Sequence, residues 1–137
     1  MEKNIEKITN HLSFLGYQIE KLQMPSGNDK AWYVARHSKN HNIILIEITP
    51  AVTMLRVGLK TGKTLSNEMI IYVNTANKAL TMNKVYFEIS EGNVDVQFEA
   101  CYSGEYAKEV FGEFYEMFQN DIRLFYGMEN FNKIWID

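Results

Sequence analysis

The chain has 137 residues and a net charge of -3 at pH 7, and this length suits one hydrophobic core, so we expect a single domain over residues 1–137. Residues 84–121 alone carry a net charge of -7, and because an acidic segment repels phosphate we expect no nucleic-acid partner. A single cysteine excludes an intramolecular disulfide, and the lack of a secretory leader or a long apolar run predicts a cytoplasmic protein that does not enter a membrane.

The first elements expected are a helix and an antiparallel group of strands. Apolar residues recur at helical spacing over residues 2–15, and Gly16 follows where a left-handed residue would end the helix. Residues 17–22 form a short strand candidate. Residues 32–37 and 43–48 then favour a hairpin, whose second strand is almost continuously apolar and β-branched.

The stretch GLKTGKT at residues 58–64 ends in the Gly-Lys-Thr of a phosphate-binding loop and overlaps the end of a strand expected over residues 53–60. A Walker A loop needs four residues between its first glycine and the Gly-Lys pair, so that successive backbone N–H groups can wrap the β-phosphate. Only three intervene here. Consecutive strands with short turns also indicate an antiparallel sheet, whereas a P-loop needs a parallel one. We therefore expect a connector that binds no nucleotide, and no cofactor.

A second helix is expected from Ser66, as its N-cap, to about residue 80. Asn74 and Asn77 lie one turn apart on it. They are candidates for a polar anchor that holds the helix to a strand end, or for hydrogen bonds to a partner or the adjoining loop. After this helix, residues 84–90 and 94–100 alternate apolar and polar side chains about a Glu-Gly-Asn turn, which predicts a hairpin.

The last helix is expected to begin after Ser103 as its N-cap and to bury a broad apolar stripe. Four glutamates recur on one of its faces at spacings of four, four and three residues: Glu105, Glu109, Glu113 and Glu116. Like charges so spaced destabilise a helix by a few tenths of a kcal/mol per pair, and a cationic partner would relieve this strain. The stripe is therefore a protein-binding hypothesis, and a merely solvated face is its alternative.

An apolar tail, residues 127–137, follows a core of about residues 2–126. Phe131 and Trp135 lie in it with two isoleucines, and so much apolar area is unfavourable in water. We expect the tail to dock across its own sheet or against a second copy of the chain, which makes both aromatic residues protein-binding candidates.

The whole order predicts an α+β fold with an antiparallel sheet of about five strands and helices packed on one face. Several short motifs occur along this order: Leu15-Gly16 closing the first helix, Val73-Asn-Thr-Ala-Asn77, the turn Glu91-Gly-Asn93, and Gly104-Glu-Tyr106 before a Phe-rich helix. These motifs resemble YbjN-type proteins, bacterial sensory-transduction regulators of type III secretion chaperone-like fold. The resemblance covers about residues 5–125, and Val73 stands where the family usually has Leu. It implies a non-enzymatic regulator or chaperone-like adaptor that forms a homodimer, and it assigns no ligand.

Other reactive residues do not form a catalytic or metal-binding set. His37 and His41 straddle a predicted turn without a nearby third ligand, and no nucleophile motif surrounds Cys101. We therefore expect surface histidines, a structural thiol, no catalytic residues and no metal. The expected function is that of a protein-binding regulator with an unidentified protein partner. The alternatives are a small acidic immunity-type inhibitor of a basic protein, or an enzyme with an unrecognised site.

Overall fold

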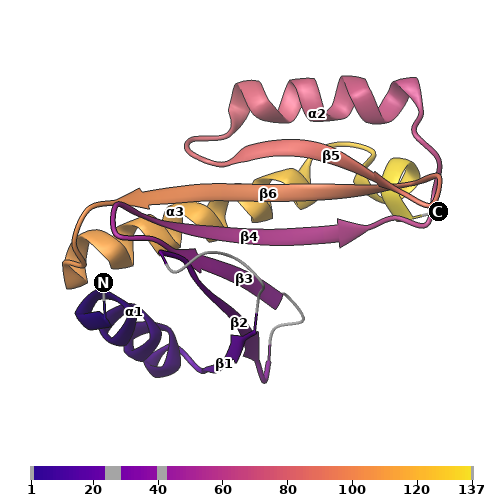
Figure 1. Cartoon of the computed structure of the whole chain (residues 1–137). Coiled ribbons are helices and arrows are strands. Elements are labelled where there is room, and N and C mark those ends of the chain that lie inside the picture. The colour runs from indigo at the N-terminus through magenta and orange to yellow at the C-terminus, as the bar shows by residue number, and fades with distance from the viewer. Residues whose placement is uncertain (1, 24–28, 40–42, 137) are drawn as a thin grey trace. The chain divides into compact units, whose positions relative to one another are not determined.

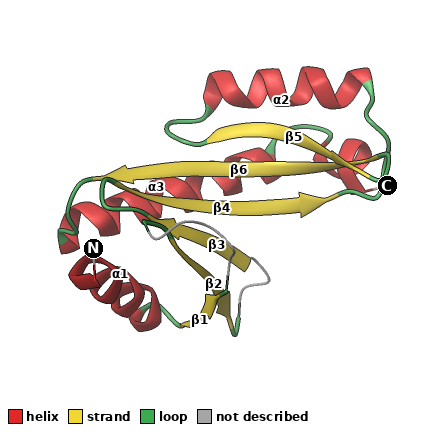
Figure 2. Cartoon of the chain, viewed as in Figure 1, coloured by secondary structure: helices red, strands yellow, loops and turns green. Residues whose placement is uncertain are grey.

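The computed structural model describes residues 2–23, 29–39 and 43–136. The helices and strands follow one another along the chain in this order: α1 (Glu2–Phe14), β1 (Tyr17–Leu22), β2 (Ala31–His37), β3 (Ile43–Ile48), β4 (Val52–Lys60), α2 (Asn67–Ala79), β5 (Lys84–Ser90), β6 (Asn93–Ser103), α3 (Lys108–Gly127) and η1 (Asn132–Ile136) (Figures 1 and 2). The strands form one sheet in the order β1-β2-β3-β4-β6-β5. The predicted α+β fold with an antiparallel sheet is thus confirmed, with six strands rather than about five. The short polar strand β1 contributes fully, because it pairs with β2 over its whole length, from Tyr17–His37 to Leu22–Trp32.

The chain forms two compact units, and neither is a continuous stretch of sequence. The first unit comprises Met1–Val57 and Cys101–Phe114, and the second comprises Gly58–Ala100 and Tyr115–Asp137. The elements β4, β6 and α3 each contribute residues to both units. The predicted single domain requires that both units fold together as one body, and this stays a prediction.

The core of the first unit forms where α1 and the strands bury alternate or helically spaced apolar side chains. Ile8 and Leu12 are one turn apart on α1 and fully buried, and Ile44, Ile46 and Ile48 point to one side of β3. The connection from α1 to β1 depends on Gly16, whose φ is +104°. The imidazole of His37 donates from Nε2 to the carbonyl of Leu15 (3.0 Å) and accepts at Nδ1 from the amide of Lys39 (3.0 Å).

The second unit joins α2 to the sheet edge and to α3 through buried polar contacts. Ser66 accepts a hydrogen bond from the amide of Met69 (3.3 Å), so the predicted N-cap is confirmed. Asp121 on α3 is buried, and its carboxylate accepts from the amides of the α2–β5 loop at 2.9, 2.8 and 2.8 Å: Thr81, Met82 and Asn83. These charge-assisted bonds fix the loop against the helix.

The start of α3 differs from the prediction. Ser103 is the last residue of β6, and α3 begins at Lys108, so the predicted N-cap is wrong. The hydroxyl of Tyr102 supplies the polar contact instead, since it accepts from the amide of Ala107 (3.1 Å) and donates to the carbonyl of Glu105 (3.0 Å). Glu105 therefore precedes the helix.

The tail packs within the second unit. It forms the short π-helical segment η1, and Trp135 is only 1% exposed. Its ring lies 5.6 Å from Tyr72, 5.7 Å from Phe125 and 6.4 Å from Phe87, measured between ring centroids. The aromatic cluster gives the tail the buried area that its composition requires.

Candidate functional site

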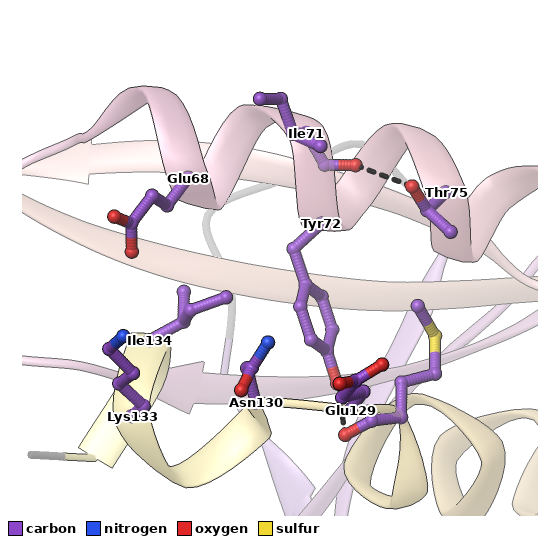
Figure 3. A pocket seen from close by; sticks show the side chains of 9 residues that line it. Glu68, Ile71, Tyr72, Thr75, Glu129, Asn130, Lys133 and Ile134 are labelled. Atoms are coloured by element: carbon purple, nitrogen blue, oxygen red, sulfur yellow. Dashed lines mark hydrogen bonds between the residues drawn. The ribbon is translucent and has the colours of Figure 1, made fainter.

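A cavity of about 490 Å³ lies in the second unit between α2 and the residues that follow α3 (Figure 3). We call it the α2–tail pocket. Its lining mixes apolar and charged side chains from two segments: Glu68, Ile71, Tyr72, Thr75, Met128, Glu129, Asn130, Lys133 and Ile134. The volume falls in the range of small-molecule and side-chain binding sites.

Tyr72 forms the floor of this pocket and is fixed there by its hydroxyl. The side chain projects from α2 towards the tail (Figure 3), is 4% exposed, and donates to the carbonyls of Phe125 and Met128. These carbonyls lie at and just after the end of α3, where the described backbone amides give them only the longer hydrogen bonds from Met128 (3.5 Å) and Phe131 (3.3 Å). Burial raises the pKa of Tyr72 to about 12. At neutral pH the hydroxyl is therefore protonated and is the donor in both of these hydrogen bonds.

Charged groups and one prominent apolar side chain form the rim. Ile71 is 65% exposed. Glu68, Glu129 and Lys133 also line the cavity, are exposed, and form no ion pair with any other described residue. Such a rim can contact a ligand or peptide with an apolar anchor and flanking charges.

The pocket offers binding groups and few reactive ones. The hydroxyl of Thr75 donates to the carbonyl of Ile71 (2.9 Å; Figure 3), as expected of a threonine within a helix. None of the nine lining residues is His, Cys or Ser. Asn130 has a φ of +68°, a left-handed conformation that asparagine tolerates, and it turns the chain between α3 and η1. The titratable side chains of the lining are thus Glu68, Tyr72, Glu129 and Lys133.

The two asparagines of α2, Asn74 and Asn77, differ in their contacts. The side-chain amide of Asn77 forms two hydrogen bonds with the backbone of Val85. Its Nδ2 donates to the carbonyl (3.1 Å), and its Oδ1 accepts from the N–H (3.2 Å). Because β5 is an edge strand, this contact satisfies backbone groups that would otherwise be open. The side chain of Asn74 is exposed and forms no hydrogen bond with another described residue.

The glutamate stripe is shorter than predicted. Glu105 lies outside α3, whereas Glu109, Glu113 and Glu116 are exposed on it. Glu116 lies 3.9 Å from Arg123, a weak exposed pair. Of the three glutamates on α3, Glu109 and Glu113 therefore have no ion-pair partner among the described residues.

The remaining candidates lie apart from the α2–tail pocket or contribute only indirectly to it. Phe131 is half-buried, and its ring is tilted by 47° against that of Tyr126 with centroids 4.9 Å apart. Trp135 is buried within its own unit. The GLKTGKT stretch comprises the end of β4 and a connector over residues 61–64. The connector is bonded to β6, since Val94 donates to the carbonyl of Lys63 (2.8 Å) and accepts from the hydroxyl of Thr61 (2.8 Å). Cys101 is exposed on β6, and His41 lies outside the described residues.

Sequence reasoning missed the α2–tail pocket because its residues come from segments about sixty positions apart. The available signals were indirect: an apolar tail that had to dock, and Tyr72 next to the apolar stripe of α2. Among the described residues, no three His, Cys, Asp or Glu side chains lie close enough together to hold a metal ion. Over the same ranges, no helix is both long and apolar enough to cross a membrane.

The chain is thus an α+β protein whose second unit carries an amphipathic pocket. No protein-family model matches the chain, and no curated protein sequence matches it. The geometry of the α2–tail pocket is therefore the basis of the functional argument below.

Proposed function

We propose that the protein is a non-enzymatic regulator or chaperone-like adaptor of the YbjN type, and that it binds a segment of a partner protein at the α2–tail pocket. The observation that carries this proposal is Ile71, which is 65% exposed at the rim of the cavity. A partner's apolar side chain in the cavity would cover Ile71, and Glu68 and Lys133 would face charges that flank it. Interfaces commonly combine such a buried apolar centre with a charged rim.

The chemistry of the pocket supports recognition rather than catalysis. Both hydroxyls in it, those of Tyr72 and Thr75, donate to helix carbonyls. The raised pKa of Tyr72 keeps its proton bound at physiological pH. The unpaired carboxylates and the ammonium of Lys133 lie on the exposed rim, where they are placed to select a partner by charge.

The test is affinity capture from the native host with the full chain, comparing Ile71→Glu with Val110→Glu. Both side chains are more than half exposed, at 65% and 56%, so neither change disturbs a core, and Val110 lies in the other unit. Wild type and Val110→Glu are expected to retain one stoichiometric partner, and Ile71→Glu is expected to lose it. Equal capture by Ile71→Glu would refute the proposed site, and thermal melting of all three chains would verify folding.

A small acidic inhibitor is the second candidate function. The specific observation in its favour is the exposed pair Glu109 and Glu113, which have no ion-pair partner among the described residues. In this case the partner would be a basic protein bound along α3. We also propose, from the resemblance, a homodimer in the cytoplasm, for which solution mass and cell fractionation are the direct measurements.

A further inference from the structure

A second cavity, of about 390 Å³, lies in the first unit beside the last turns of α1. We call it the α1 pocket. Phe14 and Leu15 contribute its apolar wall, together with the ring of Tyr106. Phe14 is 89% exposed, more than any other large apolar side chain in the described chain. A phenyl ring left this open beside a cavity is a favourable surface for an apolar ligand.

The charge of the α1 pocket has one sign. Lys7 and Lys108 line it, and no aspartate or glutamate does. Neither lysine forms an ion pair with a described residue. Glu2 and Glu105 line a separate hollow that shares Lys7 and Tyr106 but not Lys108. An anion would therefore be attracted to the Lys108 side of the pocket.

His11 adds a hydrogen-bond donor to this lining. Its Nδ1 lies 2.7 Å from the hydroxyl of Tyr106, which has no other acceptor among the described residues and so donates to it. We assign the proton of the neutral imidazole to Nε2. Burial and the positive charge of Lys108 lower the pKa of His11. The other titratable group on the same helix face is Lys7.

We propose that the α1 pocket binds an amphipathic organic anion, an acyl or aryl group that ends in a carboxylate. The apolar body covers Phe14 and Leu15, and the carboxylate lies near Lys108, with Lys7 and His11 as further donors. This ligand class follows from an apolar wall joined to a cationic rim, the reverse of the α2–tail pocket with its two glutamates. The inference is independent of the function proposed above, because it concerns different residues in the other unit.

The experiment titrates the full chain with octanoate at neutral pH and follows it by calorimetry and by NMR of the backbone and of the His11 imidazole. Saturable binding of one octanoate per chain is expected, with the largest shifts at His11, Phe14 and Tyr106. Octanol tests the apolar body without the charge, and acetate tests the charge without the body. Both are expected to bind at least roughly tenfold more weakly, the loss that corresponds to one charge-assisted contact or a few buried methylenes.

Three variants locate the site. Lys108→Gln and Phe14→Ala alter exposed side chains and are each expected to weaken octanoate binding by roughly tenfold. Lys78→Gln makes the same charge change at an exposed position of the other unit, outside both pockets, and is expected to leave octanoate binding unaltered. The bound carboxylate should also raise the pKa of His11, since an adjacent anion favours the imidazolium.

Several results would overturn the proposal. They are the absence of saturable binding, equal binding of octanol, an equal loss in Lys78→Gln, or an unchanged pKa of His11 at saturation.

Discussion

Tyr72 shows how a single side chain connects the helices of the second unit to the candidate site. Its ring lies under the α2–tail pocket, and its hydroxyl donates to carbonyls at the end of α3. Phe125 and Trp135 contact the ring edge-on, at centroid distances of 4.9 and 5.6 Å. One residue thus both caps a helix and supports the surface on which a partner would rest.

Replacing Tyr72 with Phe keeps the ring and removes the hydroxyl. Among the described residues, the carbonyl of Phe125 then keeps only its long hydrogen bond from the amide of Met128 (3.5 Å), so the free energy of unfolding at neutral pH is expected to fall by about 1–2 kcal/mol. Urea denaturation of both chains measures this difference.

The same pair of chains tests the titration of Tyr72. Its pKa is raised from 10.0 to about 12 in the folded protein, so the stability that its protonated form contributes is fully present below pH 10 and is lost as the pH rises towards 12. The stability gap between wild type and Tyr72→Phe should therefore narrow over this interval. A gap that stays constant would show that the tyrosine does not titrate with a raised pKa.

At the scale of elements, the junction between α1 and β1 requires glycine. Gly16 has a φ of +104°, and a Cβ there would lie 2.6 Å from Nε2 of His37. Gly16→Ala is expected to lower the free energy of unfolding by about 2 kcal/mol or more, because both the backbone and the imidazole would have to move. Denaturant melts of the variant check this.

Gly112→Ala is the matched control for the α1–β1 junction. It lies within α3 without a positive φ, and its added Cβ would meet only Cε1 of His11, at 3.8 Å. Since alanine favours helices, this variant should gain about 0.5–1 kcal/mol. Two alanine variants of equal stability would contradict the argument.

The acidic face of α3 makes a separate prediction. If the second candidate function holds, reversing Glu109 and Glu113 to Lys should weaken capture of the basic partner strongly at low salt and less at high salt, since salt screens exposed charges. Reversing Glu6 and Glu88, which are also exposed, changes the net charge equally and should have little effect. If both double variants capture the partner as wild type does, this face is only solvated.

Local sequence patterns were sufficient for elements whose ends are set by neighbouring residues. Ser66 caps α2 through Met69, three residues away, and Gly16 ends α1, so both could be predicted. Ser103 could not be recognised as a strand residue, because the polar contact at the start of α3 comes from the side chain of Tyr102. Both cavities depend on segments distant in sequence, α2 with the tail and α1 with Tyr106, and no periodicity reports such contacts.

At the scale of the whole molecule, the tail provides the last prediction. Deleting residues 131–137 removes Trp135, which is 1% exposed, and should lower the stability by about 3–5 kcal/mol, as for other buried tryptophans. The number of chains per particle, obtained from the mass in solution, should not change, because the tail packs within its own unit. Ile136→Ser, at a position that is 55% exposed, should leave both quantities nearly unaltered. A change of mass on truncation would place the tail in a contact between copies.

The interrupted course of both units has a consequence for synthesis on the ribosome. The first unit needs residues 101–114 to join residues 1–57, and the second needs residues 115–137 to join residues 58–100. The loop before β5 cannot form its hydrogen bonds until Asp121 has been made, because the carboxylate of Asp121 accepts from amides 38 to 40 positions earlier in the chain. Because a ribosome releases the chain from its N-terminus, neither unit can be completed until the last quarter of the protein has emerged. Nascent chains that stop before α3 will expose unfinished sheet and apolar helix faces, and will depend on chaperones or be degraded.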